Sequence, residues 1–269
     1  MMLFWEPLRI NKYLNDLITE RINNSISSAF ILLGEDESGK NMIIDNLKLS
    51  LKENKLVKFI FDCDLDHYVI LERFEKDFIN SLKLQFEDFL YMNSLDKSSF
   101  QNLFTIMKSE NLSIDIIIKI LNSLISSILN KQEKVIETEY KSQIILILRN
   151  FAIVRGDKKT ERILKDFFIN LAFSIIDEVK DLTLILESNE TNWINEIVKF
   201  GNGGKLDSRL FASKISFNAE INTRNLNELL EEISEKKRFN IAEIYKELSE
   251  TKDLSYEKVI TYLIQKGIL

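Results

Sequence analysis

The sequence predicts an α/β fold: a parallel β-sheet of five buried strands flanked by helices, with a large helical insertion and a small C-terminal helical part. Short apolar runs recur along the chain, and segments with helical periodicity follow most of them. The 269 residues include one proline and seven glycines, which is too few for an all-β fold with many tight turns. A chain of this length with 45% apolar residues can bury a large core, as one α/β domain or with a small second domain.

The first part of the chain has the pattern of a βαβ unit. Residues 8–24 carry apolar residues at helical spacing and predict an amphipathic entry helix. Residues 28–34, SAFILLG, are apolar and end at glycine, which is typical of a buried parallel strand. Residues 40–54 return to the helical period, and residues 56–64, LVKFIFDCD, predict a second buried strand. The order strand, loop, helix, strand indicates a parallel sheet.

The middle of the chain is almost entirely helical in pattern, and we expect residues 71–138 to form the insertion. A stripe of aromatic and leucine side chains at steps of three or four residues predicts packing against the core or against a partner helix. The insertion is long, so we expect it to offer a docking surface to another subunit. The stripe consists of Phe74, Phe78, Leu82, Phe86, Phe89 and Leu90.

The remaining strands follow the insertion. We expect strands at residues 142–150, 181–189 and 213–221, and a helix with a broad apolar face at residues 159–179. Asp177 and Glu178 follow an apolar run, but the next strand begins about four residues later, so we assign these two acids to the helix end.

A glycine-rich motif joins the first strand to the following helix. Gly34, four further residues, Gly39 and Lys40 have the spacing of a phosphate-binding loop. In such a loop backbone N–H groups surround the phosphates, the lysine neutralises their charge, and a hydroxyl residue binds Mg²⁺. Here Asn41 stands in place of the hydroxyl residue. Gly34, Gly39, Lys40 and Asn41 are therefore the candidate residues for binding ATP or ADP.

Together these elements resemble the nucleotide-binding core of an AAA+ ATPase, and within that class the origin-recognition and replication-initiator group. The resemblance covers roughly residues 8–235. The segment LILESNETNWINEI ends a strand at Ser188 and Asn189, and the resemblance implies that Asn189 senses the γ-phosphate. The segment GKLDSRLFASKISFNAEI implies that Arg209 reaches toward the nucleotide of a neighbouring subunit.

The chain departs from this family at both metal-binding motifs. The third strand should end in Asp-Glu, which hold Mg²⁺ and polarise water, but it ends in Arg149 and Asn150. The acidic residues 35–37 lie beside the phosphate position, where two like charges ~6 Å apart repel by about 2–3 kcal/mol at an effective dielectric of ~20. The same residues also suit a helix N-terminus, where acids are favoured. Hydrolysis is not expected.

The overall charge gives no general attraction to nucleic acid. The net charge is −6 and the pI is about 5.2, so a DNA contact needs a local basic patch or a partner. Lys246, Lys258 and Lys266 are too few for duplex binding. A single cysteine, no signal-peptide pattern and no long apolar run predict a soluble protein in the cytoplasm or nucleus, with no membrane contact.

Only one cluster suggests a metal site. Cys63, Asp64, Asp66 and His67 lie close together in sequence, but they follow a strand as loop residues, and a closed zinc site needs four well-directed ligands. We therefore expect no metal there.

The domain organisation follows from these patterns. Residues 1–222 are expected to form the AAA+-like core, and residues 223–269 a helical lid or a truncated winged-helix region. Three functions stay open. The first is a non-hydrolysing AAA+-like subunit that acts through protein contacts in a DNA-associated assembly. The second is a nucleotide-switch NTPase of the archaeal or STAND signalling or defence type, and the third is an interaction module with a vestigial loop.

Overall fold

The computed structural model describes residues 7–23, 28–34, 40–65, 71–108, 113–132, 143–151, 158–189, 214–217, 223–236, 238–251 and 254–268. Its strands form one sheet in the order β2-β3-β4-β1-β5, and every neighbouring pair is parallel. The strands are β1 (Ser28–Gly34), β2 (Val57–Asp64), β3 (Gln143–Arg149), β4 (Leu182–Ser188) and β5 (Lys214–Phe217).

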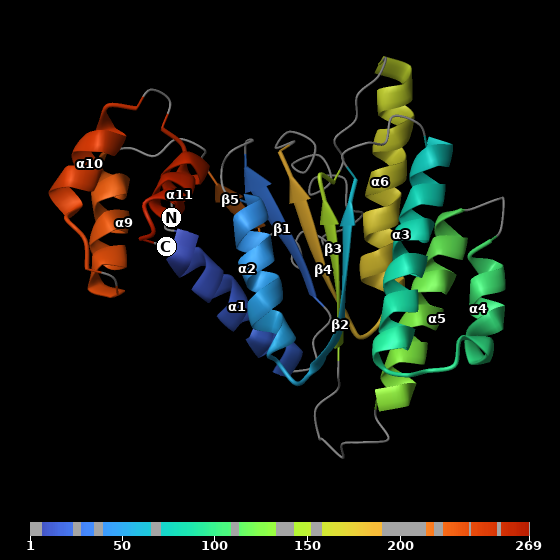
Figure 1. The fold of residues 1–269 in the computed structure, drawn as a ribbon. Helices are drawn as coiled ribbons and strands as arrows, with labels where there is room; N and C mark the ends of the chain where they lie inside the picture. Colours follow the sequence, from blue (N-terminus) through green and yellow to red (C-terminus); the bar gives the residue numbers. More distant parts are fainter. Residues whose placement is uncertain are drawn as a thin grey trace.

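Helices cover both faces of this sheet, which confirms the predicted parallel α/β fold (Figure 1). Four strands of seven or eight residues make up most of the sheet, and the four-residue β5 pairs with β1 at one edge. The described part of β5 is shorter than the predicted strand at 213–221, and residues 218–221 lie outside the described residues. Strands β1, β3 and β4 are buried almost throughout, as expected for a parallel sheet covered on both sides.

One face of the sheet packs against the two N-terminal helices and the C-terminal helices. Their apolar side chains form one continuous core with the side chains of β1, β3 and β4 that point to this face. Figure 1 shows the C-terminal helices grouped beyond α1 on this side of the sheet. These helices are α1 (Pro7–Asn23), α2 (Lys40–Lys52), α9 (Thr223–Lys236), α10 (Ile241–Ser249) and α11 (Tyr256–Gln265).

The opposite face packs against the helices of the insertion and against α6. The predicted aromatic stripe is core: each of its six side chains is at most 3% exposed. Its rings contact one another and the aromatic residues of α4 and α6; for example, the Phe86 and Phe104 centroids lie 5.9 Å apart. These elements are α3 (Leu71–Met92), the 3₁₀ helix η1 (Lys97–Phe100), α4 (Gln101–Ile106), α5 (Ile114–Gln132) and α6 (Lys158–Glu178).

Two further expectations concern the helices. Asp177 and Glu178 are the last residues of α6, which confirms their assignment to a helix end. Among the described helices, none combines the length and the apolar character needed to cross a lipid bilayer.

Because all strands are parallel, the carboxyl ends of β1, β2, β3 and β4 meet at one edge of the sheet, where the candidate site lies.

Candidate functional site

The phosphate-loop residues that the structure describes lie at the end of β1 and the start of α2. Gly34 is the last residue of β1, Lys40 is the first of α2, and Asn41 follows it on the exposed side. The Lys40 ammonium donates to the Gly34 carbonyl and, at 3.4 Å, to the Ser188 carbonyl at the end of β4. Lys40 therefore bridges β1 and β4 from the first turn of α2. Gly39 and the acidic residues 35–37 lie outside the described residues.

Lys40 also forms a buried ion pair that the sequence interpretation missed. Its Nζ atom lies 3.1 Å from Oε1 of Glu187, and the two side chains are 7% and 3% exposed. A buried charge is tolerated only with a partner, because water cannot solvate it. Glu187 is the only charged residue in the strand LTLILES, and a lone carboxylate within a buried strand was the sequence signal for such a partner.

Glu187 also holds the turn that follows β3. Its Oε2 atom accepts a hydrogen bond of 2.7 Å from the Asn150 backbone N–H, and its own carbonyl accepts one of 2.7 Å from Phe151. Asn150 adopts a left-handed backbone conformation with φ of 54°, which asparagine tolerates better than most residues. Its side-chain amide donates to Asp64 at 2.8 Å. The turn is thus tied to β2 and β4.

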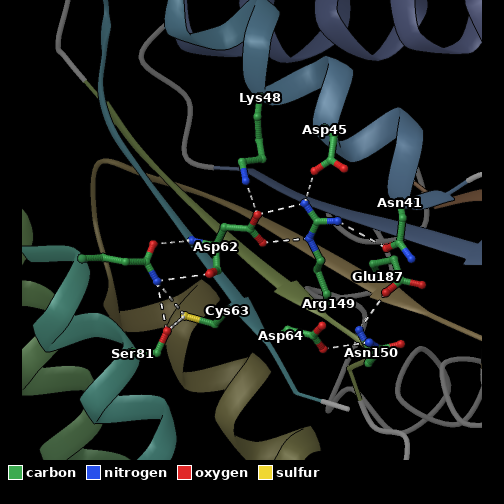
Figure 2. A network of polar contacts seen from close by, with 11 residues as sticks. Asn41, Asp45, Lys48, Asp62, Cys63, Asp64, Ser81, Arg149, Asn150 and Glu187 are labelled. Carbon is green, nitrogen blue, oxygen red and sulfur yellow. Dashed lines mark hydrogen bonds and ion pairs between the residues drawn. The ribbon is translucent and has the colours of Figure 1, made fainter. Parts of the chain in front are cut away.

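Arg149, the last residue of β3, is the centre of a second polar network (Figure 2). Its Nε and Nη2 atoms each donate to the Asp62 carboxylate at 2.9 Å, a bidentate arrangement. Nη2 also pairs with Asp45 of α2, and Nη1 donates to the Asn41 side-chain oxygen at 3.3 Å. The Arg149 side chain is 12% exposed. The guanidinium therefore fills the space between the end of β3 and the first turns of α2.

Asp62 is the shared acceptor of this network. Lys48 of α2 pairs with the same carboxylate that receives Arg149, and Gln85 of α3 binds the Asp62 backbone. Burial raises the pKa of the Asp62 carboxyl, but the hydrogen bonds from Arg149 and Lys48 outweigh it and hold this pKa below its usual value of 3.8.

This lowered pKa predicts a pH dependence of stability. A carboxyl whose pKa is lower in the folded state stabilises the protein above its unfolded-state pKa, and this contribution disappears as the pH falls through the folded-state pKa. We expect the stability difference between wild type and Asp62→Asn, measured by urea unfolding from about pH 6 to about pH 3, to be constant at the upper end and to shrink below 3.8. A difference that stays constant over the whole range would contradict the assigned network.

The arrangement places cations and carboxylates in contact with each other. Lys40 faces Glu187, and Arg149 and Lys48 face Asp62. Both lysines and the arginine are thus already paired within the chain. A phosphate that approaches this edge has to compete with the internal carboxylates for each cation.

The other predicted site residues are placed as follows. Asn189 directly follows β4 and is half-buried at the same edge as Lys40. Arg209 and His67 lie outside the described residues, as does Asp66. Cys63 is buried, and burial raises the pKa of its thiol to about 12, which disfavours the thiolate that metals bind. No group of three metal-binding side chains comes together within the described ranges.

Comparisons with known proteins find similarity in structure and none in sequence. No protein-family model matches the chain, and no curated protein matches its sequence. The Walker-type ATPase of Pyrococcus abyssi superposes with a TM-score of 0.56 at 14% identity, over 98% of this chain and 69% of that one. The ORC2 protein of Aeropyrum pernix, solved with ADPNP and ADP, gives 0.54 at 11% identity, over 96% of this chain and 63% of that one.

A eukaryotic assembly contains the same fold. A chain in the structure of Drosophila ORC bound to AT-rich DNA and Cdc6 superposes with a TM-score of 0.54 at 14% identity, over 98% of this chain and 38% of that one. This chain therefore spans from 38% to 69% of the length of these chains. The predicted resemblance is confirmed at the level of the fold: the chain shares the fold of this Walker-type ATPase and of these ORC structures.

Proposed function

We propose that this chain is a non-hydrolysing AAA+-like subunit that acts through protein contacts in a DNA-associated assembly. The observation that carries the proposal is the position of Arg149. It ends the third strand, where the family resemblance implies a metal-binding carboxylate, and its guanidinium contacts Asn41, where a hydroxyl residue would bind the same metal. A fixed positive group that occupies one metal-binding position and contacts the other disfavours Mg²⁺ there.

Hydrolysis of ATP depends on that metal. Mg²⁺ bridges the β- and γ-phosphates and neutralises the charge that develops in the transition state, and a carboxylate orients the attacking water. At the end of β3 the chain offers an arginine and an asparagine instead. Asp62 and Asp45 pair with the arginine, and Asp64 and Glu187 accept hydrogen bonds from the asparagine. We therefore expect no turnover at this edge.

The Lys40–Glu187 pair opposes nucleotide binding as well. A phosphate that draws Lys40 away leaves Glu187 with one hydrogen bond from Asn150 in a buried position. Breaking a buried ion pair on one side costs about 3–5 kcal/mol. A loss of this size weakens affinity by roughly two to four orders of magnitude, because each 1.4 kcal/mol corresponds to about tenfold.

The assembly role is supported by the neighbours in structure. ORC of Drosophila is solved with DNA and Cdc6, and an Escherichia coli chain with TM-score 0.52 and 9% identity comes from a HORMA:CdnC:Trip13 complex. In an assembly of this kind the insertion at 71–138 supplies a docking surface, and Arg209 serves the nucleotide of a neighbouring subunit. DNA is reached mainly through partners.

Thermal melting with and without nucleotide tests this proposal. We expect the melting temperature of the purified chain to be unchanged by ATP or ADP at about 1 mM, with Mg²⁺ or with EDTA, whereas a ligand at ~100 times its Kd stabilises a protein by about 2.7 kcal/mol. An Mg²⁺-dependent rise of several degrees that Lys40→Ala abolishes would overturn it.

One observation favours a nucleotide switch as the second candidate. The spacing of Gly34 and Lys40, and the hydrogen bonds of Lys40 to Gly34 and to the end of β4, keep the frame of a phosphate site. Under that alternative Lys40 exchanges Glu187 for phosphate, and nucleotide binding is tight and Mg²⁺-dependent. The melting experiment separates the two candidates.

A further inference from the structure

Strand β2 forms one edge of the described sheet. Strand β2 comes first in the strand order, and its one partner among the described strands is β3. The far side of such a strand presents backbone N–H and C=O groups that a further strand can pair with. Figure 1 shows β2 between α2 on one side and α3 on the other.

Gln85 shows which part of this edge is closed. The Asp62 N–H donates to Gln85 Oε1 at 2.9 Å, and Gln85 Nε2 donates to the Asp62 carbonyl at 3.1 Å. The side-chain amide therefore makes the two hydrogen bonds that another strand would make. Consecutive residues of a strand direct their backbone groups to opposite sides, so those of Ile60, two residues before Asp62, face the same open edge as those of Asp62. No described side chain bonds to the Ile60 backbone.

The α3 side of this edge is apolar. Phe59 of β2 lies 5.3 Å from Phe89 of α3, centroid to centroid, and Gln85 meets Asp62, so α3 runs antiparallel to β2. Met92 lies seven residues after Gln85, on the same side of α3 and toward the start of β2, and it is 78% exposed. An apolar side chain of a bound segment can cover Met92 and the half-buried Phe59.

The start of β2 is basic. Lys52 ends α2, Lys55 lies in the following turn, and Lys58 lies at a bulge in β2. Lys58 donates to the Lys55 carbonyl at 2.8 Å, and no described carboxylate pairs with any of these three lysines. Of the acids around this stretch, Asp62 is paired with Lys48 and Arg149, and Glu87 with Lys97. Glu53 and Asp88 are the others. Positive charge thus predominates beside the open backbone groups of Ile60.

We propose that the edge of β2 at Lys58–Ile60 binds an extended segment of a partner protein in which acidic and apolar residues alternate. Successive side chains of a strand point to opposite faces, so one set meets the lysines and the other meets Met92 and Phe59. The bulge and Gln85 limit the open stretch to a few residues, which suits a short segment and does not suit pairing of β2 with a second copy of itself.

A labelled peptide of about eight residues with alternating glutamate and valine is the probe. We expect it to bind the full chain, to bind at least tenfold more weakly to Lys58→Glu, and to bind unchanged to Lys108→Glu, which alters an exposed lysine after α4. Amide hydrogen exchange at Ile60 should slow when the peptide binds. The Asp62 amide, which already donates to Gln85, should change little.

Two results would overturn this inference. The first is no binding of the peptide. The second is binding that does not slow hydrogen exchange at the Ile60 amide, because such binding would come from charge attraction alone. A peptide of alternating lysine and valine should not bind. The inference rests on the proposed function only in assigning this chain a protein partner, and the tests are separate. Failure of the peptide leaves the nucleotide results unaffected, and nucleotide binding leaves the β2 edge untouched.

Discussion

Replacement of Arg149 by methionine is expected to lower the free energy of unfolding by about 3 kcal/mol. Methionine keeps much of the packing of the arginine stem but removes the hydrogen bonds to Asp62, Asp45 and Asn41. Asp62, whose side chain is 16% exposed, then keeps Lys48 as its one cationic partner in the network. The cost is below that of a fully buried pair because Asp45 is 62% exposed. Urea unfolding of both proteins measures it.

Arg224 provides the matched control. It forms an ion pair of 2.9 Å with Glu228 on α9, but the two side chains are 78% and 39% exposed. Exposed pairs of this kind contribute roughly 0.3–0.5 kcal/mol, so Arg224→Met should hardly change the midpoint of unfolding. Equal losses for Arg149→Met and Arg224→Met would show that the Arg149 network does not stabilise the fold.

Replacement of Glu187 by leucine is expected to cost about 4 kcal/mol. It removes the buried partner of Lys40 and the acceptor of the Asn150 N–H in one step. Glu187→Gln separates these two contributions, because the amide oxygen still accepts from Asn150 while the charge is gone. Unfolding in urea should show a smaller loss for glutamine than for leucine. If glutamine costs nothing, the ion pair with Lys40 does not stabilise the fold.

The double variant Lys40→Met/Glu187→Leu measures the coupling directly. Replacing both members of a buried ion pair by apolar residues is often close to neutral, whereas removing one member is costly. The double variant should therefore be more stable than the sum of the two single losses predicts, by about 2 kcal/mol. Strict additivity would mean that Lys40 and Glu187 do not interact.

The sequence predicted the sheet well because buried parallel strands have an unmistakable composition. IILILR and LTLILE are continuous apolar runs of strand length, and no amphipathic helix has that pattern. The aromatic stripe of α3 was also assigned to packing on spacing alone, and the structure places it in the core. Local periodicity determines both features.

The polar contacts at the candidate site could not be predicted in the same way. Arg149 and Asn150 stood out as departures from a family pattern, but their partners come from α2, β2 and β4, far away in sequence. The strand register decides which side chains meet. Asp64 of β2 lies opposite Arg149 of β3 in this register, which brings Asp62 within reach of the guanidinium. Glu187 was not predicted because the family pattern points to the residue after the strand, Asn189, and not to a charge within the strand.

Titration calorimetry of the full chain with Mg²⁺ and ATP tests the central claim most directly. We expect no saturable binding up to about 1 mM nucleotide, since Lys40 is paired with Glu187, and Arg149 occupies one metal-ligand position and contacts Asn41 at the other. Saturable binding below about 10 μM that requires Mg²⁺ and disappears in Lys40→Ala would contradict it. That result would show that the internal ion pairs yield to nucleotide, and the chain would be a nucleotide switch.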